Sequence, residues 1–363
     1  MGRQEPDNID EVNGSVVRLQ KKLGYEWAAI NEARERTGAT LLKLKGTLKG
    51  LDSTDASIVA YGSLARGEWT CKSDVDWTLL IDGQADPQHL EVAQNIAIRL
   101  KRDAFTEPGP AGVFGSMTFS HDLVHKIGGQ EDTNENTTQR ILLLLESLSI
   151  GKPDAYERVI SLIITRYLED DRGLKYGNLP YKVPRFLLSD IVRYWRMVAV
   201  DFVEKQRGRR GEGWGLRNAK LRASRKLLFA TGLLTCFSCD MFSTKEAREA
   251  LSGTERSTAP MAKHLRRVVC AAPLDILAFF LLNLRIKPKT CKMLLGSYDS
   301  FLALLNNEEK REHLKNLTPD DIPGDVVFDE VRRITRRFQE GLTSLFFSDD
   351  DRVCELIEFY GVF

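Results

Sequence analysis

The chain has 363 residues, with 52 Lys or Arg against 51 Asp or Glu, so its formal net charge is only +1. A balance this close to zero excludes a general attraction to nucleic acid or membranes, and any such affinity must come from a local cluster. No apolar run is long enough to span a bilayer, and the polar, acidic segment 1–14 lacks the pattern of a signal peptide, so we expect a cytoplasmic protein without a membrane partner.

The N-terminal part of the chain changes character at residue 15. The length of the whole chain predicts two domains. We expect residues 1–14 to be a disordered tail, because they are polar and few of them could join a core. From 15 to 51, apolar residues such as Trp27 and Ile30 recur at roughly helical spacing, which predicts a helical arm that packs on the sheet that follows.

Residues 57–82 carry the most informative pattern. A short apolar run, 58–61, ends at Gly62-Ser63, a polar segment follows, and a second apolar run begins at Asp76. This order predicts a strand, a tight turn, a short helix and a second strand.

Four residues of this stretch suit a phosphate-bearing ligand and a metal ion. Gly62 lets the backbone turn sharply and approach a phosphate, and Ser63 offers a hydroxyl and a backbone N–H at the start of a helix. Asp74 and Asp76 are two residues apart at the start of a strand, so both carboxylates are expected on one face. Paired hard oxygen ligands are typical of Mg²⁺ sites, in which substrate phosphates and water complete the shell.

The rest of the chain predicts one more strand and then helices. A helix is expected over 86–104, a turn at 108–112 and a third strand at 113–119, which gives a small mixed sheet with helices on one side. From residue 137 onward the apolar spacing is helical, with turns near 151–153 and 319–323. The expected fold is therefore an α/β (α+β) domain followed by an all-α helical bundle.

The order Gly-Ser, ten residues, Asp-x-Asp and an apolar strand resembles the signature of the DNA polymerase β-like nucleotidyltransferase superfamily. The resemblance implies that Gly62 and Ser63 hold a nucleoside triphosphate (NTP). It implies further that Asp74 and Asp76 are catalytic and hold two Mg²⁺ ions, with Mn²⁺ as the alternative metal.

Two further features are similar to particular bacterial branches of that superfamily. The added Ala65-Arg66-Gly67 and Ser73 look like the small antitoxin-type nucleotidyltransferases and the regulatory uridylyl- and adenylyltransferases of nitrogen metabolism. By this likeness Arg66 and Ser73 join the expected nucleotide-binding residues.

The superfamily usually has a third carboxylate on a later strand. Asp122 is the nearest candidate after the predicted third strand, and we expect it to be the third catalytic carboxylate; Asp132 is the next candidate. The alternative is that Asp122 caps or begins a short helix at Ser120. A missing third carboxylate would fit a protein that binds an NTP without turnover.

A basic stretch lies at 205–226, where nine Lys or Arg face a single acid, Glu212. If the second half is a helix, Arg222, Arg225 and Lys226 group away from its buried face, and we expect them to contact the triphosphate. Two alternatives remain open. The cluster could hold an RNA backbone, or it could be a solvated surface.

Together these observations predict a disordered tail (1–14), a helical arm (15–51), a nucleotidyltransferase catalytic domain (52–134) and an α-helical domain (135–363). The expected reaction is Mg²⁺-dependent transfer of a nucleoside monophosphate from an NTP to an acceptor hydroxyl of a protein, an RNA or a small molecule, with release of pyrophosphate. The alternatives are an oligonucleotide cyclase of the bacterial immune type, a catalytically inactive NTP-binding regulator or antitoxin-like protein, and a nucleic-acid-binding protein. The sequence selects neither the NTP, the acceptor nor the oligomeric state.

Overall fold

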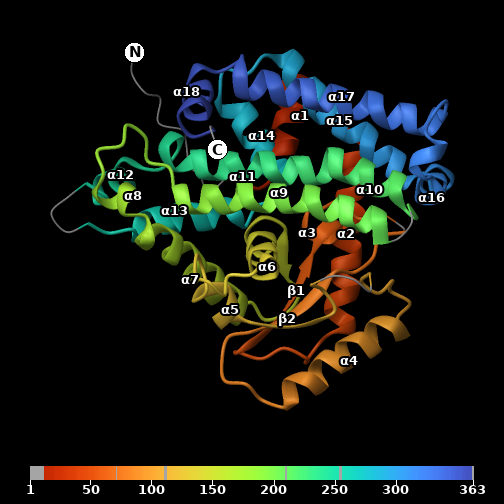
Figure 1. Ribbon diagram of the computed structural model, residues 1–363, viewed down its shortest axis with the longest axis horizontal. Coiled ribbons are helices and arrows are strands. Elements are labelled where there is room, and N and C mark those ends of the chain that lie inside the picture. The colour runs from red at the N-terminus through yellow and green to blue at the C-terminus, as the bar shows by residue number, and fades with distance from the viewer. Residues whose placement is uncertain (1–11, 71, 110–112, 209–210, 253–255, 362–363) are drawn as a thin grey trace.

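The computed structural model describes residues 12–361 apart from 71, 110–112, 209–210 and 253–255, and shows a small sheet beside a larger set of helices (Figure 1). Residues 1–11 of the expected tail lie outside the described residues. Within the described part of the chain, no helix is both long and apolar enough to cross a membrane.

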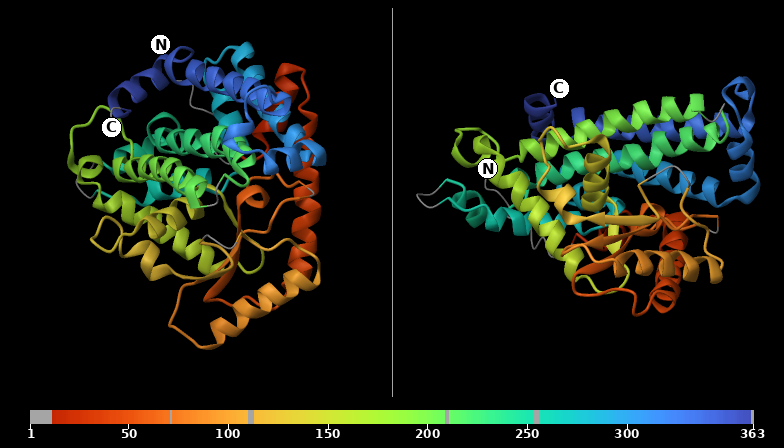
Figure 2. Two further views of the ribbon diagram at one scale, coloured as in Figure 1. Left: turned by 45° about the vertical axis from the view of Figure 1, so that its right-hand side comes forward. Right: turned by 60° about the horizontal axis from the view of Figure 1, so that its bottom comes forward.

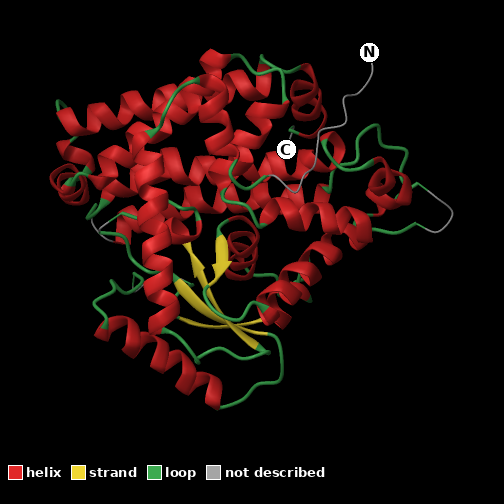
Figure 3. Ribbon diagram, turned by 180° about the vertical axis from the view of Figure 1, so that it is seen from behind, coloured by secondary structure: helices red, strands yellow, loops and turns green. Residues whose placement is uncertain are grey.

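The sheet has four strands in the order β3-β2-β1-β4 (Figure 3). Its strands are β1 (Ala56–Tyr61), β2 (Trp77–Ile81), β3 (Ser116–Phe119) and β4 (Ser147–Ser149). Strand β1 pairs antiparallel with β2 and β4, whereas β2 pairs parallel with β3. The predicted mixed sheet is confirmed, and the predicted short helix between β1 and β2 is α3 (Gly62–Ala65).

Both faces of the sheet are covered, because successive residues of a strand point to opposite faces. Ile58 and Ala60 of β1 join a core with α4 (Gln88–Arg102), whereas Val59 and Tyr61 join the larger core that includes α6 (Asn134–Leu145) and α7 (Asp154–Asp170). The expectation of helices on one side was wrong, because α6 and α7 fold back from beyond residue 134 onto the second face. Strand β4 also extends the sheet past that boundary.

The remaining described elements are helical and include the π-helical turn η2 and the 3₁₀ turn η3. They are α1 (Ser15–Leu23), α2 (Ala28–Thr47), α5 (Ser120–Val124), α8 (Arg172–Tyr176), α9 (Arg185–Gly208), α10 (Trp214–Lys220), η2 (Leu221–Arg225), α11 (Lys226–Met241), α12 (Lys245–Ala250), α13 (Ala259–Val269), α14 (Pro273–Asn283), α15 (Pro288–Asn306), α16 (Glu308–Asn316), η3 (Pro319–Asp321), α17 (Val326–Phe347) and α18 (Asp351–Tyr360). Helices α9 and α11 lie side by side above the sheet, and α17 runs along their far side (Figures 1 and 2).

The N-terminal arm belongs to the packed structure. Val12 is buried in the larger core, so residues 12–14 are not part of a disordered tail. Helix α1 packs on α14 and α2 packs on α15. Leu44 and Leu48, at the C-terminal end of α2, reach the core on the α4 side of the sheet. The arm therefore bridges the sheet and the helical region rather than packing on the sheet alone.

Candidate active site

Asp74 and Asp76 line a cavity of about 1410 Å³. Asp76 directly precedes β2, and its carbonyl accepts a 2.9 Å hydrogen bond from the Tyr61 backbone N–H. Its side chain shares the strand face of Leu80, which joins the core on the side of α6 and α7. Asp74 and Asp76 both line the cavity, so the structure brings them together as the spacing predicted.

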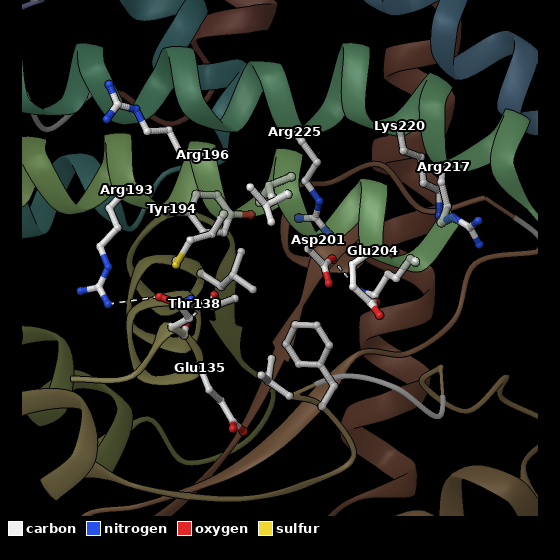
Figure 4. Close-up of a pocket in the computed structure, with 18 of the residues that line it drawn as sticks. Glu135, Thr138, Arg193, Tyr194, Arg196, Asp201, Glu204, Arg217, Lys220 and Arg225 are labelled. Carbon is white, nitrogen blue, oxygen red and sulfur yellow. Dashed lines mark hydrogen bonds and ion pairs between the residues drawn. The ribbon is translucent and has the colours of Figure 1, made fainter. Parts of the chain in front are cut away.

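Positively charged side chains from the helical region form the opposite wall (Figure 4). Arg217 and Lys220 of α10 and Arg225 of η2 lie close together at one end. Arg193 of α9 lies further along, beside Thr138 of α6, and Arg196 of α9 also lines the cavity. Two acids of α9, Asp201 and Glu204, lie beside Arg225 and Lys220 in the same wall. The cavity therefore has Asp74 and Asp76 on the sheet side and a helical wall, here called the cationic wall, in which cations outnumber acids.

Buried ion pairs hold part of this wall in place. Arg225 Nη1 donates to Glu146 Oε1 at 2.5 Å, and Arg66 Nη1 donates to the other oxygen of the same carboxylate. Arg66 Nε also donates to Glu68 at 2.8 Å, and the Tyr298 hydroxyl donates to Glu68 at 2.6 Å. Burial acts to raise the pKa of Glu146, but the two guanidinium groups outweigh burial and hold this pKa below its ordinary value.

The electrostatics of the aspartate pair favour a bound cation. Burial, followed by the charge of Asp74, raises the pKa of Asp76 to about 7, although Arg225 and Lys220 act in the opposite direction. Burial lowers the pKa of Lys220, and the charge of Asp74 partly offsets that effect. Like-charged carboxylates in a buried place need a neutralising partner.

Asp74 and Asp76 fit Mg²⁺, because they supply two carboxylate ligands of the kind that this ion binds. Gly62 has a φ of +67°, and a Cβ there would lie 2.9 Å from Oδ2 of Asp76, so only glycine leaves room for this carboxylate position. Asp74 and Asp76 would hold the ion, and water and phosphate oxygens would complete its shell. Among the residues that the structure describes, no group of three His, Cys, Asp or Glu could hold a metal ion.

The expected third carboxylate is not found beside the pair. Asp122 lies in the first turn of α5 and pairs with Lys126 at 2.7 Å, as the short-helix alternative predicted. Asp132 is buried against Arg140 at 2.8 Å. This corrects the assignment of Asp122 to catalysis. Continuing the register of β2 and β3 places Phe114, an aromatic residue that lines the cavity, beside Asp76.

Arg66 and Ser73 bond to neighbouring side chains and are not among the residues that line the cavity. Arg66 is enclosed by Glu68 and Glu146, and the Ser73 hydroxyl lies 2.9 Å from that of Thr70 and accepts from the Thr70 backbone N–H. Short polar side chains in turns commonly bond locally in this way. Ser63 is half-buried in α3 and, like Gly62, is not among the residues that line the cavity.

The basic stretch is divided between two faces. Arg225 lines the large cavity, but Arg222 and Lys226 line a separate cavity of about 580 Å³ beside α17. The cause is the π-helical turn η2, whose wider turn rotates Arg225 away from Arg222. The three residues therefore do not group on one face as expected, and only Arg225 shares a cavity with Asp74 and Asp76. Sequence reasoning missed Lys220, although it belongs to the same basic stretch.

One comparison with known proteins matches this part of the chain. Residues 41–103 match a family model described as a nucleotidyltransferase domain, and this range includes β1, the Gly62-Ser63 turn, both aspartates, β2 and α4. No curated protein matches the chain. The chain therefore contains a nucleotidyltransferase domain, consistent with the polymerase β-like superfamily, and a helical region follows it.

The contact between Gly62 and Asp76 predicts that Gly62→Ala weakens Mg²⁺ binding. Gly24 is the matched control, because its φ is +57° and nothing lies within 4 Å of the position that its Cβ would take. Both substitutions are expected to lower the free energy of unfolding by about 1–2 kcal/mol through the left-handed backbone. Only Gly62→Ala should also raise the Mg²⁺ dissociation constant, measured by calorimetry. Equal Mg²⁺ binding by the two variants would contradict the proposed cation site.

The raised pKa of Asp76 predicts that Mg²⁺ binding weakens as the pH falls through about 7. Without the ion, the folded protein retains this proton up to a higher pH than the unfolded chain, so this group makes the free energy of unfolding fall as the pH rises from about 4 to 7. Bound Mg²⁺ should reverse that loss. The increase in melting temperature caused by Mg²⁺ should be larger at about pH 8 than at about pH 6. In Asp76→Asn, the Mg²⁺-induced increase in melting temperature should no longer depend on pH over this range. If the pH dependence persisted in this variant, another group would be its cause.

Proposed function

We propose that the protein transfers a nucleoside monophosphate from an NTP to an acceptor hydroxyl with release of pyrophosphate, in a Mg²⁺-dependent reaction. The observation that carries the proposal is the placement of Asp74 and Asp76 across one cavity from Lys220 and Arg225. The matched nucleotidyltransferase domain supports nucleotidyl transfer in general. The use of Mg²⁺, the NTP substrate and the acceptor hydroxyl are the parts that we add to this general activity.

The cationic wall suits a triphosphate. Lys220 makes no hydrogen bond or ion pair with the described residues, and its amino group lies within electrostatic reach of Asp74. A triphosphate coordinated between the aspartates and Lys220 would give this ammonium the anionic partner that it lacks. Arg225 is held by Glu146, so it would meet the phosphates without first being ordered.

In the proposed reaction, the acceptor oxygen forms a bond to the α-phosphorus and gives up its proton to water. The bond from that phosphorus to the oxygen that bridges to the β-phosphate breaks, and this oxygen leaves with the pyrophosphate. Asp74 and Asp76 would hold the cation, and Lys220 and Arg225 would stabilise the negative charge that develops on the leaving pyrophosphate. Bound Mg²⁺ would supply Lewis-acid neutralisation of the phosphate oxygens. Glu146 cannot take the acceptor proton, because both of its oxygens accept from arginines and it is buried.

One observation favours a second candidate, an NTP-binding regulator without turnover. No third carboxylate groups with Asp74 and Asp76 as a possible metal ligand in the described part of the chain, although Glu135, Asp201 and Glu204 line the same cavity. The decisive experiment incubates the protein with each α-labelled NTP and Mg²⁺, with and without cell extract. Label in a product supports transfer, and saturable NTP binding without any product supports the regulator.

Replacing Asp76 by Asn tests the metal role directly. The amide keeps the shape of the side chain but removes its charge, so NTP turnover should fall at least about a hundredfold. The melting temperature without Mg²⁺ should hold or rise, because a buried charge is lost. Full turnover by a folded Asp74→Asn/Asp76→Asn variant rules out the assignment.

Lys220→Ala tests the phosphate wall. Losing one charge-assisted contact should raise the KM for the NTP about tenfold or more. The control is Lys263→Ala, which removes an exposed lysine from α13. An unchanged KM in the Lys220 variant would show that the triphosphate lies elsewhere in the cavity.

A further inference from the structure

A second cavity lies on the far side of η2, between η2 and α11 on one wall and α17 on the other. Its volume is about 580 Å³. Arg222 and Lys226 come from the first wall and Arg332 and Arg336 from the second, and Glu340 is the one acid among the lining residues described. We name these residues the basic groove.

Three of the four cations of the basic groove, Arg222, Lys226 and Arg336, make no ion pair with the described residues. Burial, followed by the charge of Arg332, lowers the pKa of Arg222, which makes no ion pair with the described residues. Lys226 donates to the Gln339 side chain at 2.6 Å, a neutral partner that joins the two walls. Arg332 pairs with Asp329 at 3.0 Å, at an exposed position outside the lining. Cations gathered around one cavity are a common arrangement for binding phosphate.

An apolar cavity of about 290 Å³ continues from the basic groove. The two share Lys226, Gln339 and Thr343 in their linings. In the apolar cavity, Trp195 of α9 and Phe229 of α11 are stacked, with ring centroids 5.2 Å apart and planes at 17°. A flat aromatic wall thus lies directly beside a cluster of positive charge.

We propose that this composite site binds a nucleotide, with its phosphates on Arg222, Lys226 and Arg332 and its base against Trp195 and Phe229. The pairing of a cationic and an aromatic compartment matches the two chemical halves of a nucleotide. A single-stranded nucleic acid would instead need a groove that tracks several phosphates and bases. The site is separate from the aspartate cavity, and it does not depend on the function proposed for that cavity.

The experiment follows Trp195 fluorescence during titration with ATP in the presence of EDTA. ATP bound at this site should quench Trp195, so the part of the quenching that is lost in Trp195→Phe reports this site. Quenching that remains in Trp195→Phe comes from ATP bound elsewhere, for example in the aspartate cavity. Arg222→Ala/Arg332→Ala should weaken ATP binding at this site at least about tenfold. The charge-matched control is Arg333→Ala/Arg337→Ala, which removes two exposed arginines of α17 outside both cavities and should leave the affinity unchanged.

Further variants and probes give the opposing outcomes. Circular dichroism checks that each variant folds, and Arg336→Ala, a single exposed change, should weaken ATP binding in the same direction. Lys220→Ala should leave this signal intact, so failure of the proposed enzymatic function would not remove it. Equal affinity in the Arg222/Arg332 variant and its control overturns the proposal. So does tripolyphosphate that binds as tightly as ATP, because the aromatic compartment would then contribute nothing, or an RNA oligomer that binds more tightly than ATP.

Discussion

The carboxylate of Glu146 is the point on which the site depends. It lies directly before β4, and it joins Arg66 behind the Gly62-Ser63 turn to Arg225 on the helical wall. Charges buried this deeply are tolerated only when they are paired, and the loss of one partner leaves a costly uncompensated charge. Glu68 extends the network to Tyr298 of α15. The two walls of the cavity are therefore fixed relative to each other by charge pairing as well as by apolar packing.

The π-helical turn η2 directs Arg225, which Glu146 anchors, and Arg222 to different cavities. Because the turn is wider than an α-helical one, Arg225 faces the aspartates while Arg222 faces α17. One short segment thus contributes cations to two cavities on opposite sides. Arg225 is anchored by Glu146, so a ligand that shifted η2 from the Arg222 side would act against the buried network. The two cavities therefore share η2 as a common wall.

The part of the site that could be predicted from the sequence depends on residues that are close together in the chain. The strands around Gly62 and the shared placement of Asp74 and Asp76 follow from a turn and a period of two, which need only neighbours in sequence. The role of Arg66 depends on Glu146, 80 residues away, and no local signal reveals that pairing. The division of Arg222 from Arg225 depends on η2, since a regular helix would have placed them together.

The size and charge of the aspartate cavity bear on the acceptor. A volume of about 1410 Å³ exceeds the roughly 300–1,000 Å³ of ordinary small-molecule sites, so an NTP would leave part of the cavity open. At the end away from Lys220 (Figure 4), Arg193 contacts Asp132 at 3.4 Å and donates to the backbone carbonyl of the same residue at 2.9 Å. These contacts hold the Arg193 side chain in place at the part of the cavity that an NTP beside Lys220 would leave open. In the proposed reaction, this open part is where the acceptor hydroxyl would enter.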